Sequence, residues 1–537
     1  MLSSEPNNNT GTVESPCSSL DVQLSDDPVY SRESQESRIE CYGAVYNRDE
    51  LARFDIDSAD DDSVAALVNR LGGYFCLIVR SQKDGTIRLA TDLYGNYRLY
   101  LIRDNQTVMV SDDWRSLVER LRTRRMGLLL NPHEQYYFQR HRYTTGGGTW
   151  VHGLDKVLPG SLLTQRDGHL TWRACLQTDI ARRRDNSHYA DENVRLLTQT
   201  ISDGIKADRP TFLFFSGGID STYLACVMKA AGIEFTPLIS KYDPVDRDNL
   251  VDQKKAETVA RRLGMPLMIN NVDARRHMGL VDRAARRHPF DMPYPVPFEY
   301  MHQWLADKYG PCNLVNGQSS DSIYCWGASG RTIGSFLQRF LVNDLFLKAP
   351  SIASGPVAAA IASVYRHRWR VPYRFRVPTG GDDYWVGLLD PQGYLPVIHT
   401  EAEYAEYHRF LLGIVRRLRV RFHDDSETLR IYMKMMYLQG PTNTYIIQAA
   451  RAYGHNLVLP FVDARVLNLR RSYQDDWRNL WFPRYILENT LKRRFSFDPG
   501  IIDQARKADC SGLDQRIYDQ TVSEAYQRWH SVCRDLF

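Results

Sequence analysis

The fold is decided by the stretch Phe212-Leu213-Phe214-Phe215-Ser216-Gly217-Gly218-Ile219-Asp220-Ser221-Thr222. Its four leading apolar residues predict a buried parallel strand, and residues 222–231 predict the helix that follows. The two glycines of the intervening turn allow a tight bend and let backbone N–H groups approach a ligand, while the helix N-terminus favours an anion. The stretch therefore predicts an anion-binding loop between a strand and a helix.

The polar side chains of this loop suit a phosphate group together with a cation. The hydroxyls of Ser216 and Ser221 can donate hydrogen bonds to phosphate oxygens. Asp220 would repel a bare phosphate, so its carboxylate fits best when Mg²⁺ lies between the two. No P-loop lysine follows the glycines, which excludes the loop of the P-loop NTPases. A plain glycine turn with a Ser or Asp helix cap is the alternative.

The loop resembles the SGGxDS pyrophosphate loop of the N-type ATP pyrophosphatases. In that superfamily a substrate oxygen attacks the α-phosphate of ATP, and the loop holds the departing pyrophosphate. The resemblance implies ATP and Mg²⁺ as cofactors, with ATP bound by Ser216, Gly217, Gly218, Asp220 and Ser221.

Length and composition favour a cytoplasmic protein with more than one domain. The chain has 537 residues, of which 43% are hydrophobic and 25% charged, and this length exceeds what one core usually holds. A formal charge of +4 argues against a dedicated nucleic-acid binder. The nine cysteines lack metal-ligand spacing, and we find neither a signal peptide nor an apolar run of membrane-spanning length. We expect reduced thiols and no membrane partner.

The N-terminal third predicts an arm followed by a β-rich domain. Residues 1–37 are polar and predict a disordered arm, and the domain extends over residues 38–180. Segments 71–79 and 87–92 predict a hairpin whose sheet continues through residues 97–111.

This domain resembles the glutamine amidotransferase domain of asparagine synthetases and β-lactam synthetases. The matching segments are Tyr46-Asn47-Arg48-Asp49-Glu50-Leu51, Gly73-Tyr74-Phe75, Ala90-Thr91-Asp92-Leu93-Tyr94-Gly95, Leu99-Tyr100 and Leu158-Pro159-Gly160. The resemblance implies an Ntn-type amidotransferase-like fold for the β-rich domain.

The departures from that family imply a degenerate domain without glutaminase activity. Active members begin with a cysteine nucleophile, whereas this chain begins Met1-Leu2. The family's Asn-Gly-Glu is replaced by Tyr42-Gly43-Ala44, which removes two polar groups, and too little chain precedes it for the family's first strands. Cys41 is expected to be a small buried apolar residue.

Residues 181–537 predict an α/β domain with a doubly wound parallel sheet, of the PP-loop ATP pyrophosphatase type. Apolar segments at 212–215, 235–240 and 267–269 alternate with helical patterns, which is typical of β-α-β units. Ligands bind at the carboxyl ends of such strands. We therefore place the adenine of ATP near Ser240 to Tyr242.

A second motif at residues 313–321 resembles the family's SGEGSDE element. The resemblance implies that Asp321 is a second Mg²⁺ ligand beside Asp220 at adjacent strand ends. An Asx-turn aspartate is the alternative. Gln318 stands where asparagine synthetases have glutamate and is a candidate for orienting substrate, because an amide cannot take a proton at neutral pH.

The C-terminal segments resemble the family again. Residues 504–512 are similar to its RQKxxFSDG loop, which implies that Lys507 stabilises the reacting acyl centre and that Arg506 contacts phosphate. A solvated lysine is the alternative. Arg484 replaces a lysine in the family's K-x-x-L helix, and Asp463 follows a VPFLD-like segment as either a helix cap or a functional group.

Residues 327–430 depart furthest from the family. They include the basic and aromatic stretch 366–376 and the arginines of 416–421, which suit an acidic peptide or a nucleic acid, or form a solvated face. This divergent segment is a possible substrate region.

These observations predict a carbon–nitrogen ligase that releases AMP and pyrophosphate, with Lys507, Asp220 and Asp321 as its catalytic residues. In lacking the cysteine nucleophile, the chain resembles the glutaminase-inactive lasso peptide cyclases. This resemblance implies macrolactam formation in a precursor peptide, with a leader-peptide protease and a leader-binding protein as partners. The alternatives are intermolecular amidation, β-lactam ring closure, a tRNA-modifying adenylating enzyme and a non-catalytic scaffold. Apart from the tRNA alternative, no nucleic-acid partner is expected.

Overall fold

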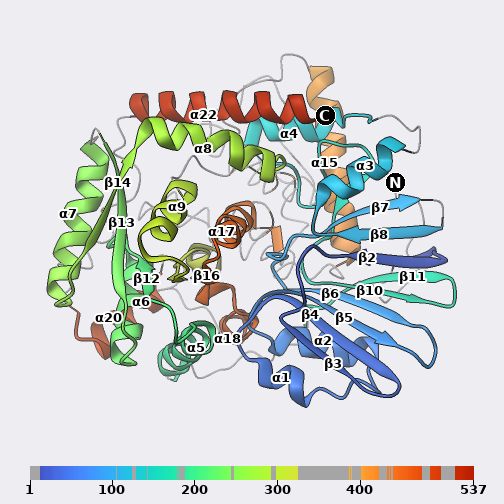
Figure 1. The fold of residues 1–537 in the computed structure, drawn as a ribbon, viewed down its shortest axis with the longest axis horizontal. Helices are drawn as coiled ribbons and strands as arrows, with labels where there is room; N and C mark the ends of the chain where they lie inside the picture. Colours follow the sequence, from blue (N-terminus) through green and yellow to red (C-terminus); the bar gives the residue numbers. More distant parts are fainter. Residues whose placement is uncertain are drawn as a thin grey trace, which may run out of the picture.

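The computed structural model describes residues 13–104, 106–123, 128–141, 143–177, 180, 188–243, 247–291, 298–324, 386, 389, 401–421, 432–433, 436, 440–473, 484–497 and 515–537. Two stacked sheets lie on one side of the molecule, one antiparallel and one mixed, and a parallel sheet with its helices forms the other side (Figure 1). We call the first part the sandwich (residues 13–177) and the second the parallel-sheet half (residues 188–537).

The sandwich consists of a seven-stranded and a four-stranded sheet. The larger sheet has the order β1-β11-β10-β6-β5-β4-β3, and the smaller one β2-β8-β7-β9. Their bounds are β1 Val13–Pro16, β2 Ser19–Gln23, β3 Tyr30–Glu33, β4 Ser37–Val45, β5 Gly73–Ser81, β6 Ile87–Thr91, β7 Tyr100–Asp104, β8 Thr107–Ser111, β9 Leu154–Lys156, β10 Ser161–Arg166 and β11 His169–Ala174. The helices that the structure describes beside them are α1 Arg48–Arg53, α2 Asp61–Arg70, α3 Trp114–Thr123 and α4 Pro132–His141.

Alternation along β5 shows how the layers pack. Cys76 and Ile78 belong to the apolar core shared by the two sheets, and Leu77 and Val79 pack in the core that includes Leu67 of α2. Successive residues of a strand point to opposite faces, so one strand serves both cores. Because β5 is apolar on both faces, the larger sheet packs between α2 on one face and the smaller sheet on the other.

Two predictions for this region are wrong. Residues 13–37, predicted as a disordered arm with too little chain for further strands, contain β1, β2, β3 and the start of β4, while residues 1–12 lie outside the described part. The predicted hairpin of β5 and β6 is confirmed, but residues 97–111 do not continue its sheet, because β7 and β8 belong to the second sheet.

The parallel sheet has the strand order β14-β13-β12-β15-β16, and all its pairings are parallel. Its strands are β12 Thr211–Phe214, β13 Thr236–Asp243, β14 Met268–Asp273, β15 Asn313–Val315 and β16 Asn456–Val458. The order runs one way from β12 to β14 and the other way from β15 to β16. The doubly wound sheet predicted from the β-α-β pattern is thus present. Its topological switch point, where the strand order reverses, lies between β12 and β15.

Helices surround this sheet and connect it to the sandwich (Figure 1). They are α5 Tyr189–Gly204, α6 Ile219–Ala230, α7 Arg247–Arg262, α8 Ala274–Arg287, α9 Phe298–Tyr309, α10 Ser320–Tyr324, α15 Glu401–Arg421, α17 Gly440–Ala452, the 3₁₀ turn η4 Pro460–Val462, α18 Ala464–Ser472, α20 Tyr485–Arg494 and α22 Gln515–Leu536. In the described part of the chain, no helix combines the length and apolarity needed to cross a bilayer.

Buried polar contacts join the sandwich to the parallel-sheet half. The Tyr74 hydroxyl donates to the carbonyl of Leu457 at 3.3 Å. Lys156 of β9 forms a 2.8 Å ion pair with Asp291, which follows α8, and both side chains are almost inaccessible to water. Since buried polar groups are costly unless paired, these contacts fix how the two parts meet.

Candidate active site

The two predicted motifs meet at the topological switch point of the parallel sheet, between β12 and β15. The loop after β12 carries residues 215–218, and the loop after β15 carries residues 316–319. A Cβ placed on Gly317 would lie 3.6 Å from the Cβ of Asp220. The Ser320 hydroxyl donates to Oδ1 of Asp220 at 2.8 Å. The carboxyl ends of β12 and β15 therefore bring one loop of each motif into contact.

The first loop has the tight geometry that its glycines predicted. Gly217 has a φ of +69°, a conformation that favours glycine. The backbone N–H of Gly218 donates to the Ser216 hydroxyl at 3.2 Å, and the Ser221 hydroxyl donates to the carbonyl of Gly218 at 3.2 Å. The two hydroxyl oxygens lie 3.4 Å apart. The predicted anion-binding side chains of this loop are thus gathered at the N-terminus of α6.

Helix α7 borders this loop from one side. A Cβ on Gly217 would lie only 2.8 Å from the Cα of Ala256, so the loop and the helix backbone are in direct contact. A Cβ on Gly218 would lie 3.9 Å from Nζ of Lys255, a residue that is 9% exposed. The sequence reasoning missed Lys255, because only tertiary packing brings α7 to the loop.

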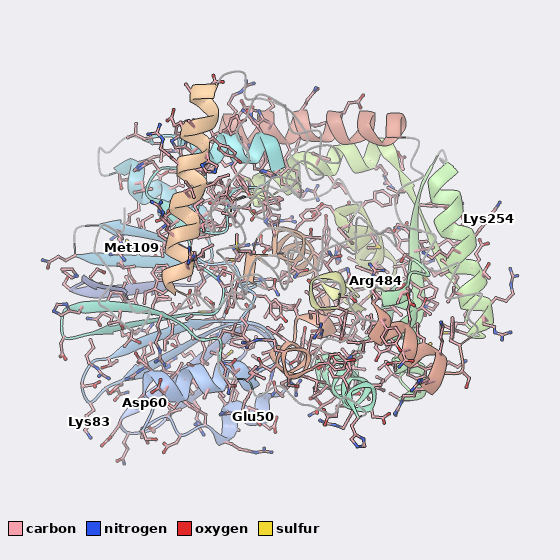
Figure 2. The ribbon with its side chains drawn as sticks, turned by 180° about the vertical axis from the view of Figure 1, so that it is seen from behind. Glu50, Asp60, Lys83, Met109, Lys254 and Arg484 are labelled. Atoms are coloured by element: carbon pink, nitrogen blue, oxygen red, sulfur yellow. The ribbon has the colours of Figure 1, made fainter. Side chains whose placement is uncertain are left out.

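Asp220 has a partner on each of its carboxylate oxygens. Ser320 contacts Oδ1, and the guanidinium of Arg484 lies 3.5 Å from Oδ2. Arg484 precedes α20 in the left-handed region, with a φ of +62°. In Figure 2 it lies toward the middle of the molecule. The K-x-x-L resemblance was the one signal that pointed to Arg484, and the contact with Asp220 adds it to the site.

The second loop is organised by an asparagine. Oδ1 of Asn316 accepts the backbone N–H of Gln318 at 2.9 Å, which is an Asx-turn contact. Ser319 has a φ of +75°, and its hydroxyl exchanges hydrogen bonds with the Asn443 amide of α17. A non-glycine residue in this conformation is strained, and such strain is often found at functional loops. The loop thus brings Gly317 close to Asp220, and Gln318 is the next residue along the chain.

Asp321 and Ser240 lie on elements near these loops. Asp321 follows Ser320 within α10, and its side chain is outside the described part. Ser240 lies on β13 opposite Asn270, and its hydroxyl donates to Met301 Sδ at 3.1 Å and accepts from the Asn270 amide at 3.4 Å. Its hydroxyl therefore has partners within the protein.

Several other predicted residues fall elsewhere. Lys507 and Arg506 lie outside the described residues, as does the basic stretch 366–376. Asp463 is the N-cap of α18, since its carboxylate accepts from the backbone N–H of Arg465 at 2.8 Å and from the Thr200 hydroxyl at 2.7 Å. This cap accounts for Asp463 without a role in the site.

Two of the arginines predicted at 416–421, Arg416 and Arg417, are exposed on α15. Exposed basic side chains suit both a solvated face and a surface for an acidic partner, so their exposure does not choose between the two interpretations.

The region that resembles a glutamine site is packed by its own residues. Cys41 is fully buried, which raises the pKa of its thiol, as expected of an apolar core residue. Asp92 accepts backbone N–H groups of Tyr94, Asn96 and Tyr97 at 3.0 to 3.1 Å. Burial raises the pKa of Asp92 to about 6, although these hydrogen bonds oppose the rise.

Among the described residues, no group of three or more His, Cys, Asp or Glu side chains could hold a metal ion. The predicted site has two carboxylates, and Mg²⁺ in nucleotide sites is commonly held by one or two together with phosphate oxygens.

Comparison with known proteins adds to this geometry. Residues 193–333 match the family model for asparagine synthase. These residues include both loops, so the match supports the asparagine synthetase family for the segment that holds the site. Asparagine synthetase [glutamine-hydrolyzing] 1 from Bacillus subtilis (strain 168) is 22% identical over 325 residues, which cover 57% of this chain. The chain spans about half the length, 50%, of that relative.

Two solved structures share a low overall similarity with this chain. An NMN synthetase from Francisella tularensis has a TM-score of 0.21 and 13% identity, over 44% of this chain and 97% of that one. An allosteric regulatory enzyme of purine biosynthesis has a TM-score of 0.19 and 11% identity, over 46% of this chain and 62% of the other. At these TM-scores, neither structure carries an argument about this fold or function.

Proposed function

We propose that this protein is an ATP-dependent, AMP-forming amide synthetase. The observation that carries the proposal is the contact between the SGGxDS-type loop and the second loop through Asp220 and Ser320 at the switch point of the parallel sheet. In the first step a substrate carboxylate oxygen bonds to the α-phosphorus of ATP, and the bond to the bridging oxygen of pyrophosphate breaks. An amine then bonds to the acyl carbon, AMP leaves, and the amine nitrogen loses a proton.

The protein's own groups have distinct tasks in these steps. The N-terminus of α6 and the hydroxyls of Ser216 and Ser221 bind the departing pyrophosphate. Arg484, 3.5 Å from Asp220, adds positive charge at the phosphate side of the site. Lys507 stabilises the tetrahedral oxyanion formed by amine attack. Gln318 orients the substrate, and Ser240 to Tyr242 border the adenine. Arg506 is a further phosphate contact.

The carboxylates assigned to this site are of the kind that binds magnesium. Asp220 offers a carboxylate at the entrance of α6, and the following motif supplies Asp321 one position after Ser320. When bound, Mg²⁺ would neutralise charge that develops on the pyrophosphate. Asp220 and Asp321 would hold it.

The amine comes from the substrate or from free ammonia rather than from glutamine. The buried Cys41 and the replacement of the family's Asn-Gly-Glu by Tyr42-Gly43-Ala44 support a sandwich without glutaminase activity. Intramolecular macrolactam formation in a lasso-type precursor peptide is the reaction we favour, by family resemblance. A leader-peptide protease and a leader-binding protein would then be its partners in the cytoplasm.

Product analysis tests the proposal. Candidate peptides and small carboxylates are incubated with the protein and Mg-ATP, and AMP, pyrophosphate and intact product masses are followed. We expect AMP release with loss of one water from a single peptide. A product in which NH₂ replaces OH, or in which two molecules are joined, would show intermolecular amidation and would rule out cyclisation. Loss of water from a small β-amino acid would indicate β-lactam closure, and adenylation of tRNA would indicate the nucleic-acid alternative. If no substrate gives AMP, the synthetase proposal fails.

A further inference from the structure

Helix α7 places a lysine against the glycine end of the pyrophosphate-type loop. Lys255 is 9% exposed, and its Nζ lies 3.9 Å from the position of a Cβ on Gly218. The Ser216 hydroxyl oxygen lies 3.1 Å from the same position. The ammonium and the hydroxyl therefore border the same side of Gly218.

The backbone of α7 beside Lys255 is packed against the loop. The positive φ of Gly217 brings the loop so close to α7 that a Cβ on Gly217 would lie 2.8 to 2.9 Å from the backbone of Ala256. Lys254, the preceding residue, is exposed, and Figure 2 shows it on α7 at the outer edge of the molecule. Of these two adjacent lysines, Lys255 faces the loop and Lys254 faces solvent.

We propose that Lys255 binds the pyrophosphate group of ATP and of the leaving product. The inference rests on the proposed function and adds a cation that the motif itself lacks, since no P-loop lysine follows the glycines. As the bond from the α-phosphorus to the bridging oxygen breaks, its electron pair moves to pyrophosphate. The ammonium stabilises that charge and transfers no proton.

Two cations then border the loop at different ends. Arg484 lies beside Asp220 at the entrance of α6, and Lys255 lies beside Gly218 in the turn. A phosphate chain that follows the loop would meet both. Because Lys255 is largely shielded from water, its attraction to a phosphate group is screened less than that of an exposed lysine.

Binding measurements on matched variants test this role. Inorganic pyrophosphate with Mg²⁺, Mg-ATP and AMP are titrated calorimetrically into the full-length protein and its Lys255→Met, Lys255→Arg and Lys254→Met variants. We expect Lys255→Met to weaken pyrophosphate and ATP binding about tenfold to a hundredfold, the range for a hydrogen bond to a charged group. AMP affinity should not change. Lys255→Arg should retain most of the affinity, and Lys254→Met should match the wild type.

The outcomes separate this inference from the proposed function. If the wild type binds ATP and pyrophosphate and Lys255→Met binds them equally well, the role of Lys255 is wrong while the synthetase proposal stands. An equal loss for AMP would also overturn it, by showing a structural role. If the wild type binds neither ATP nor pyrophosphate, both proposals fail. Should Lys255→Met not fold, Lys255→Gln takes its place with the same expectation.

Discussion

Gly217 combines a backbone requirement with a space requirement. Its φ of +69° strains any L side chain, and a Cβ would approach the Ala256 backbone to 2.8 Å. We expect Gly217→Ala to lower the free energy of unfolding by about 2–3 kcal/mol and to abolish ATP binding, because the loop must move away from α7. Urea denaturation and calorimetric titration with Mg-ATP measure the two effects.

Gly232 supplies the control for this substitution. It has nearly the same φ, +68°, but nothing lies within 4 Å of its Cβ position. Gly232→Ala therefore carries the backbone strain without the contact, and should cost about 1 kcal/mol with ATP binding intact. Equal behaviour of the two variants would show that contact with α7 is unimportant.

Asp220 is the residue whose charge the proposed reaction needs most. Asp220→Asn keeps the size of the side chain and removes the carboxylate that faces Ser320 and Arg484. We expect AMP formation to fall at least about 100-fold, the order of loss for one electrostatic stabiliser of a transition state. The exposed Asp208, changed to Asn, is the control and should retain full activity. Unchanged AMP formation in Asp220→Asn would contradict the mechanism.

At the scale of elements, α9 (Phe298–Tyr309) carries a histidine that makes the fold sensitive to acid. His302 is fully buried between Phe214 and His455, and neither of its ring nitrogens has a hydrogen-bond partner among the described residues. Burial lowers its pKa well below the usual value. Below pH about 6.5 the unfolded chain therefore binds a proton that the folded protein does not, and stability falls as pH falls.

Denaturation at several pH values measures this sensitivity. Between pH 7.5 and 5.5 the free energy of unfolding should decrease, with His302 contributing up to about 1.4 kcal/mol for each pH unit below its unfolded pKa. His302→Phe should reduce that dependence while leaving the other buried histidines to contribute. If the wild type and the variant have the same pH dependence, His302 is not the source.

The elements show what the sequence could predict and where it failed. The strand, turn and helix around Gly217 were predictable because their pattern is local: four apolar residues, two glycines and an apolar helix. β1 and β3 were missed because short strands with many polar residues do not alternate clearly. The sheet membership of β7 was wrong, because alternation tells which faces are buried and not which strand is the neighbour.

At the scale of the whole molecule, the candidate site depends on contacts between distant segments. Arg484 reaches Asp220 across more than two hundred and fifty residues of sequence, and Lys255 reaches Gly218 through helix packing. A motif match predicts the residues of one loop, but long-range contacts follow from the packing of layers. This explains why the loops were found from sequence, why Lys255 was missed, and why the resemblance that pointed to Arg484 did not predict its contact with Asp220.

The buried ion pair between Lys156 and Asp291 tests how firmly the sandwich and the parallel-sheet half are joined. The two groups are 2.8 Å apart, with side-chain exposures of 1% and 4%. Removing one partner leaves a buried charge that is only partly compensated, since Arg98 lies 4.0 Å from the other Asp291 oxygen. Lys156→Met should therefore lower the free energy of unfolding by about 3–5 kcal/mol.

Burial is tested as the cause of this loss by comparing the free energy of unfolding of Lys156→Met with that of a variant of an exposed ion pair. Arg70 and Glu50 form a 3.0 Å ion pair in which Arg70 is half exposed, and Figure 2 shows Glu50 at the lower edge of the molecule. Arg70→Met should cost less than about 1 kcal/mol, because water already screens that pair. A small effect in both variants would mean that Asp291 finds another partner when Lys156 is lost, and that other contacts, such as Tyr74 with Leu457, hold the two parts together.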